Sequence, residues 1–90
     1  MTAKAYDVRL RPAARRALRR LDRPVQRRIL DALTDLGMDP RPHGTKALVG
    51  GEGLLRIRIG DYRVVYEVQD DQLIVLVVTL GHRRLVYRGL

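Results

Sequence analysis

The feature that most constrains the fold is a change in the spacing of apolar residues at Leu54. In the helical part of the chain before it, apolar side chains recur every three or four residues, as in helices with one buried face. After it, Leu55, Ile57 and Ile59 alternate with Arg56 and Arg58, as in a half-buried strand. A chain of 90 residues has room for one domain, 1–90, so we expect both halves to share a core in an α+β fold.

The first half of the chain predicts one strand followed by two helices. Polar and apolar residues alternate over 6–10, which indicates a short N-terminal strand. Pro12 suits the first turn of a helix, Asp22 suits the N-cap of a second, and Gly37 suits its end. Because the connection between the helices is short, we expect an antiparallel α-helical hairpin.

The second half predicts a loop and then a three-stranded antiparallel sheet. Residues 38–53 contain two prolines and four glycines, which indicates a loop, and we expect a short ordered piece at 46–48. Three strands follow, separated by the two-residue turns Gly60–Asp61 and Asp70–Asp71. We place these strands at 54–59, 62–69 and 73–80, with Gly81 as the end and 85–87 as a tail or a fifth strand.

The charge of the chain favours an anionic partner. Lys and Arg number 18 against 10 Asp and Glu, a net charge of +8, and all but Lys4 and Lys46 are Arg. Arg matches phosphate oxygens with a planar fork of donors, so nucleic acid is the favoured partner over an acidic protein. No apolar segment resembles a signal peptide or a membrane span, so we expect a cytoplasmic protein without a membrane partner.

Three arginines are expected to share one face of the sheet. With Gly60–Asp61 as a two-residue turn, Arg58 faces Arg63 and Arg56 faces Val65. The opposite face is an apolar floor for the helices, made by Leu55, Ile57, Ile59, Tyr62, Val64 and Tyr66. Like charges that face each other repel, which suggests an absent anion such as phosphate. The alternative is that the Arg side chains splay into water.

Two further groups of residues are candidates for a site. With Asp70–Asp71 as a second two-residue turn, an exposed apolar strip lies beside the arginines and suggests a protein-binding site: Val65, Ile74, Leu76 and Val78. An error in the register is the rival explanation.

Near the C-terminus, His82 can move protons, Arg83 can stabilise charge on a phosphorane, and Tyr87 can stack on a base. A pairing of His82 with His43 is the less favoured arrangement.

The chain lacks the residues that several other kinds of catalytic chemistry require. The chain has no Cys and no Ser, which excludes both as nucleophiles. It has no phosphate-binding glycine motif, and two isolated His residues do not make a metal site. We therefore expect neither a cofactor nor a metal.

The order of these segments resembles the RelE/ParE toxin superfamily over roughly residues 5–88. The resemblance is carried by Arg41-Pro42, by the stretch 51–66, and by Gly81-His82-Arg83 with Tyr87. It implies a RelE-like, microbial-ribonuclease-like fold without the usual His–Glu pair. It also implies a type II toxin that cleaves mRNA in the ribosomal A site by attack of the 2′-hydroxyl, without metal.

The resemblance also implies roles for single residues. The family's basic positions fall on Arg56, Arg58, Arg63 and Arg83, and its terminal tyrosine falls on Tyr87. Some relatives have Lys where this chain has Arg56 and Arg58. Because Arg is a poor general base, His82 is the candidate base or acid, with Tyr87 as the alternative.

The implied partners are a cognate antitoxin, the ribosome and mRNA, with operator DNA bound only by the toxin–antitoxin complex. A further set of cations is a candidate for ribosomal RNA phosphates, or for an acidic antitoxin: Arg15, Arg16, Arg19, Arg20, Arg27, Arg28 and Lys46. Two other functions stay open. One is inhibition of DNA gyrase by a ParE-like toxin that cuts nothing, and the other is a nucleic-acid-binding repressor module.

Overall fold

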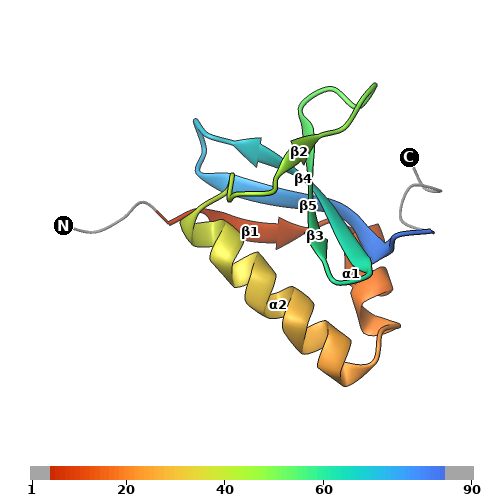
Figure 1. The fold of residues 1–90 in the computed structure, drawn as a ribbon. Helices are drawn as coiled ribbons and strands as arrows, with labels where there is room; N and C mark the ends of the chain where they lie inside the picture. Colours follow the sequence, from red (N-terminus) through yellow and green to blue (C-terminus); the bar gives the residue numbers. More distant parts are fainter. Residues whose placement is uncertain (1–4, 85–90) are drawn as a thin grey trace.

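The helices and strands follow one another in the order expected from the sequence (Figure 1). The computed structural model describes residues 5–84. The elements are β1 (Asp7–Leu10), α1 (Pro12–Arg19), α2 (Arg23–Met38), β2 (Lys46–Ala47), β3 (Leu54–Ile59), β4 (Tyr62–Gln69) and β5 (Ile74–His82). The α+β class is thereby confirmed, and the short piece at 46–48 is a strand. The tail at 85–87 lies outside the described residues.

Within residues 5–84 the sheet has five strands, in the order β1-β5-β4-β3-β2. The last three strands form the expected antiparallel unit. The N-terminal strand adds to it parallel to β5, with Val8 beside Val75 and Leu10 beside Val77. At the other edge β2 pairs antiparallel with β3. The sheet is therefore larger than the three-stranded unit expected from the sequence.

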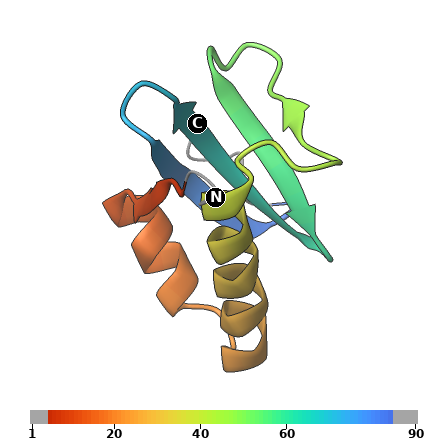
Figure 2. The same cartoon turned by 90° about the vertical axis from the view of Figure 1, so that its left-hand side faces the viewer.

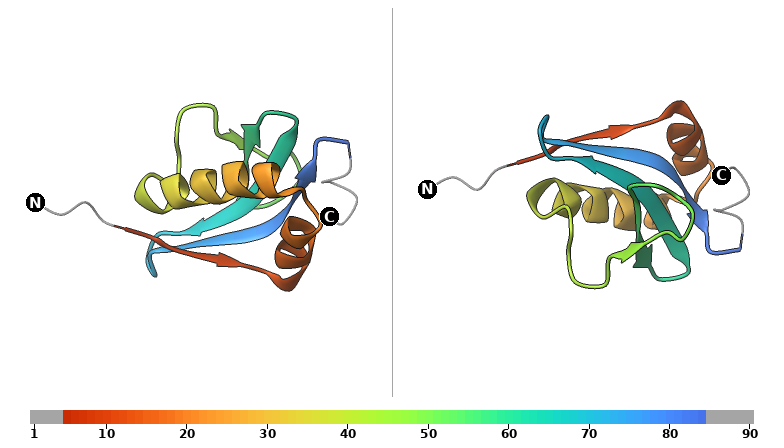
Figure 3. Two further views of the ribbon diagram at one scale, coloured as in Figure 1. Left: turned by 90° about the horizontal axis from the view of Figure 1, so that it is seen from below. Right: turned by 90° about the horizontal axis from the view of Figure 1, so that it is seen from above.

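Both helices cover the same face of the sheet. Figure 2 shows α1 and α2 side by side in front of the strands. Seen from below, α2 lies in front of the strands, and seen from above the strands lie in front of α2 (Figure 3). None of the helices within residues 5–84 is long and apolar enough to cross a membrane. Among the described residues, the opposite face of the sheet carries no helix.

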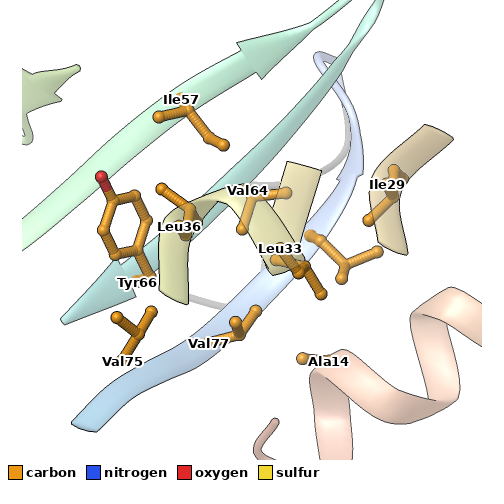
Figure 4. Close-up of a cluster of buried hydrophobic side chains, with 10 residues drawn as sticks. Ala14, Ile29, Leu33, Leu36, Ile57, Val64, Tyr66, Val75 and Val77 are labelled. Carbon is orange, nitrogen blue, oxygen red and sulfur yellow. The ribbon is translucent and has the colours of Figure 1, made fainter. Parts of the chain in front are cut away.

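The core lies between the helices and the covered face of the sheet (Figure 4). Val64, Tyr66, Val75 and Val77 are fully buried there. The expected floor for the helices is confirmed, since Ile57 is also buried and the other floor residues pack against the core. The helices contribute Ala14, Ile29, Leu33 and Leu36. This packing fixes which side chains of each strand point away from the helices.

Gly37 does not end the second helix as the sequence predicts. The helix continues to Met38, and Gly37 is buried where β1 crosses it. The Tyr6 amide donates a hydrogen bond to the Gly37 carbonyl at 2.7 Å. A β-carbon at Gly37 would lie 3.1 Å from the Tyr6 carbonyl oxygen and 3.3 Å from Val8 Cγ2. Glycine therefore allows the close approach of β1 and α2.

The predicted turn at Asp70–Asp71 is wrong, because the connection from Gln69 to Ile74 uses two more residues. Leu73 ends it at a φ of 54°, the one left-handed non-glycine residue among the described residues. A β-bulge follows between Val65 and Tyr66, since Tyr66 pairs with Val77 and Val65 with Thr79. The strand then runs through Gly81 to His82, past the predicted end.

These changes correct the expected exposed apolar strip. Ile74 and Leu76 do lie on the face away from the helices, because both pair with residues of that face. Val78, however, is the extra residue of the bulge and does not continue the row. Val65 has no exposed surface, and Ile74, Leu76 and Val78 are half-buried. The strip is therefore not an open apolar surface.

A polar latch ties the loop after α2 to β1 and to the β4–β5 turn. Arg41 donates from Nη1 and Nη2 to the two oxygens of Asp70 at 3.1 and 2.8 Å. The Tyr6 hydroxyl donates to Asp70 Oδ1 at 2.7 Å. These donors, Arg41 first, lower the pKa of Asp70 from 3.8 to about 2. Nearby, the Tyr66 hydroxyl donates to the Pro40 carbonyl at 2.7 Å, and burial raises the pKa of Tyr66.

Candidate functional site

The register of β3 and β4 brings three arginines to the face away from the helices. Arg58 lies directly opposite Arg63, and Arg56 lies opposite Val65, as the sequence predicts. Their neighbours along the strands, such as Ile57 and Val64, point into the core. We call Arg56, Arg58 and Arg63 the basic cluster.

The described neighbours of the basic cluster on the sheet are small or polar residues. Arg58 is exposed, and its Nε donates to the Gly60 carbonyl at 3.1 Å. Glu67, on the same face, accepts from Gln69 Nε2 at 3.1 Å. On β5 the face presents Thr79 opposite Val65 and Gly81 opposite Arg63, both small residues. On the β5 side the sheet therefore places no bulky side chain directly beside Arg63.

The β3–β4 turn brings a helical arginine to the same end of the sheet. Gly60 has a φ of 61°, a conformation that glycine adopts without strain. A β-carbon there would lie 2.8 Å from Arg28 Nη2, so the Arg28 guanidinium covers the turn. The other helical candidates are exposed, away from the core: Arg15, Arg16, Arg19, Arg20 and Arg27.

Lys46 lies on the sheet and not with the helical arginines. It pairs directly with Arg56 across β2 and β3, and it is exposed. Partners that face each other on adjacent strands point their side chains to the same face. The sequence predicted Lys46 as a cation for ribosomal RNA, and its place beside the basic cluster was missed. A short edge strand reached through a glycine-rich loop leaves little signal in the sequence.

His82 is not brought together with the basic cluster. It pairs with Tyr62, which packs against the core, and the two rings meet edge to face with centroids 5.7 Å apart. Its Nδ1 accepts from the Arg84 amide at 3.3 Å. Because Gly81 is the residue opposite Arg63, His82 points to the other face. The register therefore separates His82 from the basic cluster.

The remaining candidates lie near this end of the sheet or outside the described residues. The Arg83 amide donates to the Asp61 carbonyl at 2.8 Å, and Arg83 is exposed. His43 lines a pocket of about 270 Å³ between α2 and β3, together with Asp35 and Arg58. Tyr87 lies outside residues 5–84. Within that range, no three His, Asp or Glu side chains gather as a metal ion would require.

Comparison with known proteins decides the family. A family model described as the ParE toxin of the parDE type II toxin–antitoxin system matches residues 8–87. This chain belongs to that toxin family. The toxin is also 30% identical over 84 residues to Toxin RelG of Mycobacterium tuberculosis, covering 92% of this chain and 97% of the relative. The resemblance to the RelE/ParE superfamily is therefore confirmed.

Solved structures of RelE toxins share the fold of this toxin. The toxin–antitoxin complex RelBE2 from Mycobacterium tuberculosis matches with a TM-score of 0.80 at 28% identity, covering 91% of this chain and 95% of that one. The archaeal RelE–RelB complex from Pyrococcus horikoshii matches with a TM-score of 0.77 at 30% identity, covering 88% and 96%. Both solved structures are complexes of a toxin with an antitoxin.

Proposed function

We propose that this toxin is a ribosome-dependent endoribonuclease that cleaves mRNA in the A site. The observation that carries the proposal is the pair Arg58 and Arg63, directly opposite each other on the face that the helices leave uncovered. Two guanidinium groups at one place suit the extra negative charge that builds on a phosphate under attack. The similarity to RelE toxins supports the same conclusion.

In this mechanism the 2′-hydroxyl oxygen attacks the adjacent phosphorus, and the bond from phosphorus to the 5′-oxygen breaks. The 2′-hydroxyl loses its proton, the leaving 5′-oxygen gains one, and the products carry a 2′,3′-cyclic phosphate and a 5′-hydroxyl. Arg58, Arg63 and Arg83 donate hydrogen bonds from their N–H groups to the non-bridging phosphate oxygens. Arg56 adds positive charge. No step uses a metal.

The proton acceptor is not one of these arginines, because Arg stays protonated. His82 faces the other side of the sheet, so the base is Tyr87 or a group that the ribosome supplies. Dependence on the ribosome then has a chemical reason: the toxin contributes charge stabilisation, and the bound complex completes proton transfer. In the account proposed here, free RNA is a poor substrate.

The partners follow from the two remaining surfaces. The exposed arginines of α1 and α2 bind phosphates of ribosomal RNA, which gives affinity without sequence choice. An antitoxin binds the toxin and keeps it inactive, a proposal supported by the related toxin–antitoxin complexes. Ile74, Leu76 and Val78 are half-buried and offer it a limited contact, whereas Val65 has no surface to offer.

A triple substitution tests the proposal in cells. Replacing Arg58, Arg63 and Arg83 with Ala should abolish growth arrest when the toxin is expressed without an antitoxin. Arg11→Ala removes one charge from an exposed residue outside these sets and should stay toxic. Circular dichroism of each purified variant reports whether the fold survives. Full toxicity of a folded triple variant would sink the idea.

Inhibition of DNA gyrase is the second candidate function. It is favoured by the family model, which is described as the ParE toxin. A supercoiling assay with purified gyrase separates the two. The ribonuclease proposal expects full supercoiling activity in the presence of the toxin.

A further inference from the structure

Two pairs of cations lie next to each other on the face of the sheet away from the helices. Lys46 is directly opposite Arg56, and Arg58 is directly opposite Arg63. Residues that face each other across neighbouring strands have β-carbons about 4.5–5.5 Å apart, close enough for both side chains to bind one anion. The face therefore offers two like-charged pairs, each the size of a phosphate site.

The spacing of the two pairs matches a polyanion that runs along β3. Arg56 and Arg58 are two residues apart on that strand, about 6.6 Å at the usual rise per residue. Neighbouring phosphates of a nucleic-acid strand have a spacing of the same order. One bound strand can therefore place consecutive phosphates on the two pairs.

The backbone on both sides of Lys46 is held in place. Before it, the Thr45 amide and Oγ1 both donate to the Pro42 carbonyl, at 3.1 and 2.7 Å. After it, the Leu48 amide donates to the Leu54 carbonyl at 3.0 Å. These bonds keep the exposed Lys46 opposite Arg56, although like charges in direct opposition destabilise a sheet. A repulsive pair held in this way is suited to an anion.

We propose that Lys46 and Arg56 form a second phosphate subsite for single-stranded RNA. The scissile phosphate lies between Arg58 and Arg63, and the neighbouring phosphate lies between Lys46 and Arg56. The inference rests on the proposed function for the identity of the ligand, and it gives Lys46 a role in holding the substrate. A lysine on an edge strand can also serve to prevent edge-to-edge pairing of sheets, and that role predicts a different result.

Binding of RNA that cannot be cleaved tests the subsite. The probe is a fluorescently labelled trinucleotide with every 2′-hydroxyl methylated, titrated with the free toxin at several salt concentrations. Lys46→Ala should lower the slope of log K against log salt by about 0.7, the value for one lost phosphate contact on a single strand. Lys46→Arg should keep the wild-type slope, and so should the control Arg11→Ala.

A second probe removes one phosphate. Wild-type toxin should bind the trinucleotide, with two phosphates, more tightly than the matching dinucleotide, and Lys46→Ala should lose most of that gain. Lys46→Gln, close to lysine in length, repeats the test if Lys46→Ala aggregates. An unchanged slope, an unchanged gain, or no measurable binding by the wild-type toxin at low salt overturns the subsite. Because neither probe can be cleaved, the result does not depend on whether the toxin is a nuclease.

Discussion

At the scale of single residues, the arginine pair could be predicted because its register is local. Gly60–Asp61 joins β3 and β4 directly, so a two-residue turn fixes Arg58 opposite Arg63. Lys46 and His82 could not be placed in the same way. Lys46 reaches Arg56 through a loop that the sequence does not define. His82 changes face because of the bulge at Val78 in β5 and because that strand runs two residues past Leu80.

Asp70 makes the stability of the toxin depend on pH. Its folded-state pKa of about 2 lies below its ordinary 3.8, so its contribution is complete above the ordinary value and is lost as pH falls through the folded one. Asp70→Asn should therefore lower the Tm at neutral pH, with the difference closing between about pH 4 and pH 2. Thermal melts over this range check it, with the exposed neighbour Asp71→Asn as control. A Tm difference between wild type and Asp70→Asn that does not vary with pH would contradict the stabilising role of the Asp70 carboxylate.

At the scale of elements, the predictions succeeded where the pattern of apolar residues alone decides. Both helices, β3 and β4 begin within a residue or two of the expected positions. The misjudged elements depend on tertiary contacts instead. The sequence pattern predicts a helix end at Gly37, but the structure uses glycine there to let β1 approach α2 closely. The length of the β4–β5 turn depends on Leu73, which adopts a left-handed conformation.

Gly37→Ala tests the packing of β1 on α2. In an ordinary helix interior this change stabilises by roughly 0.5–1 kcal/mol. Here the new methyl group would meet the backbone of Tyr6 at 3.1 Å, and we expect the free energy of unfolding to fall by about 1 kcal/mol or more. Urea unfolding gives the value, with the exposed Thr34→Ala on the same helix as control. A stabilised Gly37→Ala variant would mean that β1 can move away from α2 at little energetic cost.

At the scale of the whole molecule, the fold separates two cationic surfaces. The basic cluster and Lys46 occupy one end of the sheet face away from the helices, and the helical arginines lie on the helices, which cover the other face. Arg28 over the β3–β4 turn lies between the two. The net charge of +8 predicts a polyanionic partner, but only the strand register divides that charge into the proposed substrate site and the proposed docking surface.

The central claim is that the arginine pair cleaves mRNA on the ribosome, and primer extension on an mRNA translated in a cell-free system tests it most directly. The toxin should produce new ends in register with codons, and they should disappear when ribosomes are omitted. Arg58→Ala and Arg63→Ala should each slow cleavage by about 100-fold or more, while Arg11→Ala should not. Absence of cleavage at toxin levels that still arrest growth would contradict the account and point to gyrase.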